Sequence, residues 1–324
     1  MRLGLDVFGG DHAPASPLES LKLLAPELSQ GCTIVLFGDE QQIAEGLKDV
    51  PATKGKFEVV HCPEVITMSD KPVKAFKAKS ASSIVRGFEW LKNGQIDMFA
   101  SAGNSGAMFV GATNVIGTIP GIIRPASLVP LPNLSGSYKI ILDVGTNPDA
   151  RADVLYQYGF LGSVYASVVM GIQQPKVALL NIGEEEKKGN LLVQSAYQMM
   201  KETADFNFIG NVEGRDLFND KADVVVCDGF TGNIVIKQLQ AIYRIMEKRG
   251  LLDSYFARFN YETYGGTPII GINGNVIIGH GISSPLAIKN MMLLGREVAE
   301  SRLSEKIKDA LDNFGIQKFE WTNF

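Results

Sequence analysis

A charged loop between an apolar run and a helix holds the residues best suited to chemistry. Residues 177–190 read VALLNIGEEEKKGN, and their first four positions are typical of a strand buried on both faces. A lysine at such a strand end can neutralise a phosphate, and a neighbouring acid can orient that lysine. The competing interpretation is a solvated run of charges. The candidates in this loop are Asn181, Lys187, Lys188 and Asn190, the last of which is also suited to cap the helix that follows.

A glycine-rich loop at residues 9–14, GGDHAP, is a second candidate because it follows an apolar run and precedes a helix. Glycines let the backbone approach a ligand, and the free N–H groups at a helix start attract anions. His12 would bind phosphate or stabilise an oxyanion, with Gly10 and Asp11 beside it. The alternative is a tight turn in which Asp11 caps the helix.

Residues 101–107, SAGNSGA, form a third loop of small and polar residues. The sequence begins like the nucleophile elbow of hydrolases, but Ala107 replaces the last glycine and no Asp and His follow in the hydrolase arrangement. We therefore expect this loop to offer backbone and side-chain donors to phosphate. The candidates are Asn104, Ser105 and Gly106.

Two further loops, residues 143–147 and 228–233, each place an aspartate and a glycine directly after a strand. Turn chemistry alone explains this pattern, but two such loops at one sheet edge also favour a ligand site. Asn147 and Asn233 can donate to phosphate without repelling it. The remaining candidates here are Asp143, Asp228 and Gly232. His280, between two glycines, either contacts the ligand or packs near an interface.

These loops need a sheet whose strands end at a common edge. Apolar runs followed by polar loops and helices occur at residues 3–7, 33–37, 57–61, 97–100, 139–142, 177–180, 206–209 and 224–227. The alternation predicts a doubly wound, largely parallel α/β sheet covered by helices. The chain of 324 residues fits one α/β catalytic domain, either undivided or in two lobes. Residues 235–261 are predicted as a helical pair, and residues 269–284 as late strands.

Composition narrows the class of protein. The net charge of −4 gives no reason to expect a nucleic-acid partner. Three widely spaced cysteines and an opening strand without an apolar signal region favour the cytoplasm. No apolar tract reaches the roughly 18 residues of a membrane span. The acids at residues 213–223 are interpreted as a solvated face rather than as metal ligands, so we expect no metal ion there.

Five loops together resemble those of the bacterial phosphate acyltransferases of phospholipid synthesis, the PlsX family. They are GGDHAP, SAGNSGA, LDVGTN, NIGEEEKKGN and DGFTGN, and YGG at residues 264–266 and GHG at residues 279–281 join them. The resemblance runs in order from Met1 to about Arg296. It implies that acyl-[acyl carrier protein] and inorganic phosphate are converted to acyl phosphate and free carrier protein. The acyl phosphate then serves a membrane glycerol-3-phosphate acyltransferase.

The resemblance also implies a fold like that of isocitrate and isopropylmalate dehydrogenases and of phosphotransacetylases, a homodimer, no cofactor and a peripheral membrane association. One departure is that the segment between Asn233 and Tyr264 is shorter than in many members, where a helical hairpin reaches the bilayer. Aromatic and aliphatic residues at 251–259 fit a membrane-facing tip or a dimer interface, and we favour the interface. We therefore expect a cytoplasmic protein, either free or peripheral on the inner face of the membrane.

A basic cluster has two interpretations, a solvated helix face or a docking surface for acyl carrier protein, which is small and acidic. Its members are Lys71, Lys74, Lys77, Lys79 and Arg86. Two alternative functions also stay open. A metal- and NAD-dependent hydroxyacid dehydrogenase could share the fold, although no G-x-G-x-x-G fingerprint is present. The other alternative is a non-catalytic adaptor that binds carrier protein. The polar glycine loops argue against it because they suggest a small-molecule pocket.

Overall fold

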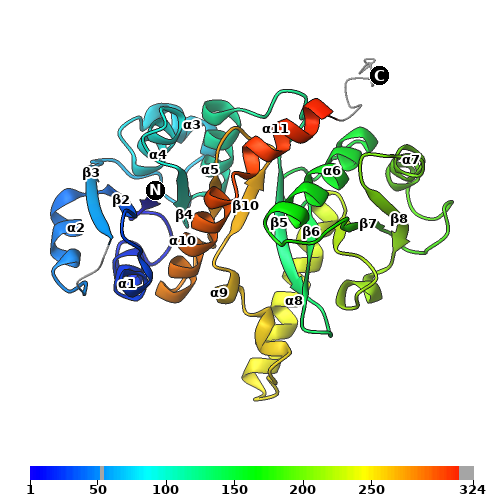
Figure 1. The fold of residues 1–324 in the computed structure, drawn as a ribbon. Helices are drawn as coiled ribbons and strands as arrows, with labels where there is room; N and C mark the ends of the chain where they lie inside the picture. The colour runs from blue at the N-terminus through cyan, green and yellow to red at the C-terminus, as the bar shows by residue number, and fades with distance from the viewer. Residues whose placement is uncertain (52–54, 314–324) are drawn as a thin grey trace. The chain divides into compact units, whose positions relative to one another are not determined.

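The computed structural model describes residues 1–51 and 55–313, and the chain divides into two compact units (Figure 1). Of the described residues, unit 1 comprises those within 1–117 and 261–300, and unit 2 comprises 118–260 and 301–313. Each unit has its own strands and its own hydrophobic core.

The sheet of unit 1 has the strand order β3-β2-β1-β4-β11-β10, in which only β10 is antiparallel to its neighbour. The strands are β1 (Arg2–Asp6), β2 (Thr33–Gly38), β3 (Lys56–His61), β4 (Met98–Ser101), β10 (Thr267–Ile270) and β11 (Val276–Ile278). The α-helices are α1 (Ala15–Leu24), α2 (Glu40–Leu47), α3 (Pro72–Ala78), α4 (Ser83–Lys92), α5 (Ser105–Gly111), α9 (Tyr261–Tyr264) and α10 (Pro285–Glu300). Short turns of other helix types are η1 (Ala25–Glu27) and the π-helix η2 (Ala112–Ile116).

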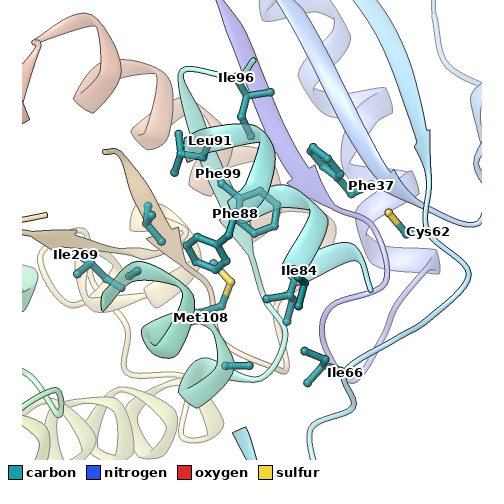
Figure 2. Packing of buried hydrophobic residues seen from close by; sticks show 14 of the residues in the cluster. Phe37, Cys62, Ile66, Ile84, Phe88, Leu91, Ile96, Phe99, Met108 and Ile269 are labelled. Carbon is teal, nitrogen blue, oxygen red and sulfur yellow. The ribbon is translucent and has the colours of Figure 1, made fainter. Parts of the chain in front are cut away.

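Helices cover both faces of this sheet because successive side chains of a strand point to opposite faces. Because Gly87 and Gly295 lack side chains, the helices α4 and α10 pack close to strand β4. The ring of Phe99 fills the space beside Gly87 of α4, and Met98 fills the space beside Gly295 of α10. Figure 2 shows the α4 side of this core, where Phe88 lies between Phe99 and Met108, with ring centroids of Phe88 and Phe99 5.3 Å apart.

The sheet of unit 2 has the strand order β5-β6-β9-β7-β8, in which β5 is antiparallel to β6 and the other neighbours are parallel. The strands are β5 (Ala126–Pro132), β6 (Tyr138–Leu142), β7 (Lys176–Leu180), β8 (Asn207–Val212) and β9 (Val224–Val226). The helices are α6 (Ala152–Val168), α7 (Leu191–Met200), α8 (Gly229–Lys248) and α11 (Leu303–Asn313), with the 3₁₀ turns η3 (Gly214–Phe218) and η4 (Phe256–Phe259). The predicted largely parallel α/β architecture is confirmed in each unit.

A lysine side chain is fully buried in the core region of unit 2. Lys139 of β6 is 0% exposed, and its Nζ donates to the carbonyl oxygen of Asp216, 2.9 Å away. Burial lowers the pKa of Lys139 to about 8, although the nearby carboxylates of Asp220, Asp223 and Asp216 act in the opposite direction. Keeping Lys139 charged in the folded protein therefore costs substantial desolvation free energy.

Residues 235–261, predicted as a helical pair, contain most of α8 and then turns and η4. Arg258 of η4 ties this segment to the turn between β5 and β6. Its guanidinium donates to the carbonyl oxygens of Asn133, Gly136 and Ser137, and it lies 4.2 Å from the ring centroid of Tyr138. None of the helices in the described part of the chain has the length and apolar character needed to cross a bilayer.

Candidate active-site loops

Three loops of unit 1 that are distant in sequence meet at the carboxyl ends of β1, β4 and β11, which are neighbouring strands. The backbone N–H of Asp11 donates to the carbonyl oxygen of Gly281 over 2.7 Å, and the N–H of Gly279 donates to Ser101 over 2.8 Å. A side chain at Gly10, whose φ is +109°, would lie 3.1 Å from the oxygen of Gly281. The loops at residues 9–14, 101–107 and 279–281 therefore form one cluster.

A buried carboxylate lies beneath two of these loops. Asp6, the last residue of β1, is 1% exposed, and the hydroxyl of Ser101 donates to its Oδ2 over 2.6 Å. Burial raises the pKa of Asp6, while hydrogen bonds from Ser101, Ser83, Phe8 and Gly9 act in the opposite direction. Asp6 was not among the site residues predicted from the sequence. The available signal was an acid in an apolar strand directly before a glycine loop.

The two candidate histidines, His12 and His280, are exposed, as is Asp11. Helix α1 begins at Ala15 with Pro14 at its cap and no side-chain cap hydrogen bond, so the alternative reading of Asp11 as its cap is wrong. His280 packs edge-on against the ring of Tyr261, with centroids 5.2 Å apart. His12 and His280 belong to loops that touch through Asp11 and Gly281.

The side chain of Asn104 forms its hydrogen bonds within the protein. Its Nδ2 donates to the carbonyl oxygens of Thr67 and Asp70, each 3.0 Å away, and its Oδ1 accepts from the N–H of Ala107. Its side chain therefore reaches a ligand only if those bonds break. Ser105 is exposed in the same loop, and a side chain at Gly106 would meet Pro72 at 2.4 Å.

In unit 2, Asp143 organises the loop after β6. Its carboxylate accepts hydrogen bonds from the hydroxyl and N–H of Ser127 and from the N–H groups of Val144 and Asn147. Asn147 is 4% exposed, and its Nδ2 donates to Pro125 and to Asp143. Both side chains hold the loop, and a direct contact of Asn147 with phosphate would require these bonds to break.

Helix α8 starts directly from the second loop of this edge. Asp228 caps it by accepting from the N–H and the hydroxyl of Thr231, each 2.8 Å away. A side chain at Gly232 would lie 2.0 Å from the oxygen of Asp143, which fixes the close approach of the two loops. The amide of Asn233 lies over Gly145, whose φ is +90°, and forms no hydrogen bond within the described residues.

The charged loop at residues 181–190 follows β7, which is parallel to β9 and lies next to it. Asn181 holds the loop through a bond from its Nδ2 to the oxygen of Lys188, and Asn190 caps α7, as predicted. Glu184 pairs with Lys221 and Glu186 with Lys201. Within the described residues, Lys187 and Lys188 are exposed and have no ion-pair partner.

The basic cluster of unit 1 is less uniform than its sequence suggests. Lys79 pairs with Asp70 and donates to the oxygen of Val65, and Arg86 pairs with Glu89. The other members are exposed and have no ion-pair partner among the described residues, namely Lys71, Lys74 and Lys77.

Neither a thiol nucleophile nor a metal site accompanies these loops in the described residues. Cys32, Cys62 and Cys227 are all buried, and burial raises the pKa of each thiol, that of Cys62 to about 12. Reactive cysteines need the opposite shift. No group of three or more His, Cys, Asp or Glu side chains in the described part could hold a metal ion. A cavity of about 590 Å³ in unit 2, lined by α6 and α11, contains none of the predicted residues.

Solved structures place the chain in a fold class of phosphotransacetylases and related dehydrogenases. The EutD phosphotransacetylase from Staphylococcus aureus superposes with a TM-score of 0.63 at 17% identity, covering 92% of this chain and 94% of that one. A 4-hydroxythreonine-4-phosphate dehydrogenase from Klebsiella pneumoniae gives a TM-score of 0.58 at 14% identity, covering 92% and 99%. At such identities the similarity shows the fold alone.

Sequence comparison gives the family. The family described as "Fatty acid synthesis protein" matches residues 1–249. A phosphate acyltransferase of Dictyoglomus thermophilum is 40% identical over 331 aligned residues, which cover 96% of this chain and 98% of the relative. The chain belongs to the phosphate acyltransferase family of fatty acid and phospholipid synthesis, as the loops predicted, and it is an enzyme of the acyltransferase class.

Proposed function

We propose that the chain transfers the acyl group of acyl-[acyl carrier protein] to inorganic phosphate, releasing acyl phosphate and the free carrier protein. Family membership supports the reaction class, and the observation that carries the proposal is the pair Lys187 and Lys188. Both lysines stand at the carboxyl end of β7, and the neighbouring acids Glu184 and Glu186 are engaged by other lysines. Two lysines that form no salt bridge within the described residues, at the end of a strand, suit a dianionic substrate.

The reaction is a direct displacement. A phosphate oxygen attacks the thioester carbonyl, a carbon–oxygen bond forms, and the carbon–sulfur bond breaks as the tetrahedral intermediate collapses. The carrier thiolate leaves readily because its thiol has a pKa of about 8.5, and it then takes a proton from solvent. The buried, neutral thiols of the chain are consistent with a mechanism that needs no acyl-cysteine intermediate.

The proposed roles follow from which side chains remain available. Lys187 neutralises phosphate and orients it, with Lys188 adjoining. The amide of Asn233, which has no hydrogen-bond partner among the described residues, donates to a phosphate or carbonyl oxygen. His12 in the exposed loop after β1 stabilises the oxyanion, and the Ser105 hydroxyl with the N–H groups of its loop supplies further donors. Asn104, Asp143 and Asn147 hold the loops through the bonds described above.

Partners are also part of the proposal. The exposed lysines 71, 74 and 77 on and beside α3 suit the acidic surface of a carrier protein, whereas Lys79 and Arg86 have acidic partners of their own. We further propose a homodimer and a peripheral contact with the inner face of the membrane, where the acyl phosphate would pass to a glycerol-3-phosphate acyltransferase. The aromatic residues of η4 and its surroundings are the surface for one of these contacts.

The test measures thiol release from palmitoyl-[acyl carrier protein] with and without inorganic phosphate. We expect release that depends on phosphate and a product that hydroxylamine cleaves. Lys187→Ala should raise the KM for phosphate about tenfold or more, since it removes one charge-assisted contact. Lys201→Ala is the control, because it removes an exposed lysine of unit 2 that already pairs with Glu186. Thiol release that does not depend on phosphate would contradict the proposal, and so would equal changes of the KM for phosphate in the two variants.

A further inference from the structure

The carboxylate of Asp6 is buried without a cationic partner. It is 1% exposed, and no ion pair joins it to a Lys, Arg or His among the described residues. An uncompensated buried charge costs free energy unless hydrogen bonds stabilise it. Asp6 obtains these bonds from two hydroxyls and from the backbone N–H groups of its own loop.

These bonds connect two loops of the candidate site. Oδ1 of Asp6 accepts from the N–H of Phe8 over 3.0 Å, and the N–H of Gly9 also donates to the carboxylate. Oδ2 accepts from the hydroxyl of Ser101 over 2.6 Å, and the same hydroxyl oxygen accepts from the N–H of Gly103 over 2.9 Å. The hydroxyl of Ser101 therefore connects Asp6, which binds the loop at residues 9–14, to the loop at residues 101–107.

The fit around this carboxylate leaves no room for a side chain. A Cβ at Gly9 would lie 2.4 Å from Oδ2 of Asp6, 2.6 Å from Oγ of Ser101 and 2.7 Å from the nitrogen of Gly103. The two glycine loops thus touch directly over the Asp6–Ser101 pair. The N–H groups of Phe8, Gly9 and Gly103 donate to this pair.

Unit 2 contains the same arrangement, in which a buried carboxylate without an ion pair holds a glycine loop through hydrogen bonds. Among the described residues, Asp6 and Asp143 are the buried carboxylates without an ion pair, since the third buried acid, Asp216, pairs with Lys221. Asp143 directly follows a strand, accepts a hydrogen bond from a serine hydroxyl of the adjoining strand and accepts from N–H groups of its own glycine loop. By contrast, Asp39 after β2 only caps α2. A buried carboxylate of this kind therefore precedes two of the candidate loops, those at residues 9–14 and 143–147.

We propose that Asp6 and Ser101 are positioning residues for phosphate: they fix the spacing of the loops that carry His12 and Ser105. This inference rests on the proposed function for the reaction but concerns phosphate binding itself. Ser101→Ala removes both hydrogen bonds of the Ser101 hydroxyl and leaves the Asp6 carboxylate in place. Asp6→Asn keeps the shape but presents an amide N–H₂ where backbone N–H groups donate.

Two measurements on the full chain test the proposal: the two KM values in the thiol-release assay, and the dissociation constant of inorganic phosphate by calorimetry. Ser101→Ala should raise the KM and the dissociation constant for phosphate about tenfold, with the KM for the acylated carrier protein within about twofold. Ser101→Thr retains the hydroxyl and should remain within about threefold of the unchanged protein. Asp39→Ala, which removes a cap in the same unit, controls for lost stability and should change neither phosphate constant.

The outcomes separate the two proposals. If the unchanged protein releases no thiol but binds phosphate tightly enough to show the loss in Ser101→Ala, the proposed reaction fails and the positioning role stands. If Ser101→Ala and Asp39→Ala affect phosphate equally, or if both KM values rise together, the positioning role is wrong. Absence of phosphate binding by the unchanged protein would overturn it as well. Where Ser101→Ala does not fold, Asp6→Asn and Ser101→Thr carry the same comparison.

Discussion

The buried Lys139 should make stability depend on pH in an unusual direction. Burial lowers its pKa from 10.5 to about 8, so between these values the unfolded chain binds more protons than the folded protein. Stability therefore rises as the pH increases through this window. Most lysines, which gain a partner on folding, act in the opposite direction.

The size of the effect follows from the displacement of the pKa. One pKa unit corresponds to about 1.4 kcal/mol, so the displacement of Lys139 amounts to about 3 kcal/mol in total. About 2 kcal/mol of this is recovered between pH 7 and pH 10. Lys139→Met has a similar length and no charge, and it loses this dependence. It also loses the bond to the oxygen of Asp216, which lowers its stability at every pH by about 1 kcal/mol.

The assay is urea unfolding of the unchanged protein and of Lys139→Met at several pH values from 7 to 10. Buried thiols and tyrosines also titrate in alkali, but both proteins contain them, so the difference in unfolding free energy isolates Lys139. We expect the unchanged protein to gain about 2 kcal/mol on the variant across this range. A difference that stays constant within about 0.5 kcal/mol would refute the reasoning, because it would mean that the lysine keeps an ordinary pKa.

Three further predictions concern packing and docking. Phe88→Ala, at a position that is 0% exposed, should lower the free energy of unfolding by about 3–5 kcal/mol in urea, and a loss below 1 kcal/mol would contradict the packing of Figure 2. Arg258→Ala should cost about 1–3 kcal/mol, and Arg258→Lys should restore less than half, since an ammonium cannot reach three carbonyl oxygens and stack on a ring. Charge reversal at Lys74 and Lys77 should raise the KM for carrier protein about tenfold at low salt, and an unchanged KM would remove the docking surface.

The strand pattern was predictable because a parallel sheet buries both faces of its strands, which leaves short apolar runs in the sequence. Elements without that signature were missed. Strand β5 contains Pro130 and Pro132, which normally argue against a strand. Helix α6 is buried on nearly every side, so its apolar residues show no helical period. Both misses arise because burial by tertiary neighbours removes the periodicity on which sequence reasoning depends.

The loops of the candidate site were also predictable, but the assignment of their side chains was not. Asn104 and Asn147 look like free amides in the sequence. In the structure each donates to backbone carbonyls, of Thr67, Asp70 and Pro125, that lie more than twenty positions away along the chain. Asn233 has no such partner in the described residues. Whether a side-chain amide is available to a ligand depends on long-range contacts, and the spacing of residues in the sequence does not reveal these.

The close packing of α4 against β4 and α5 in unit 1 couples the evolution of the residues in contact. The rings of Phe99 and Phe88 occupy the space that side chains at Gly87 and Gly111 would fill, at 2.1 and 2.2 Å from the missing Cβ atoms. An alanine at Gly87 is therefore tolerated only with a smaller residue at position 99. Such epistasis predicts that these positions change jointly among relatives, so that the fitness of a glycine substitution is set by the partner ring rather than by the helix that carries it.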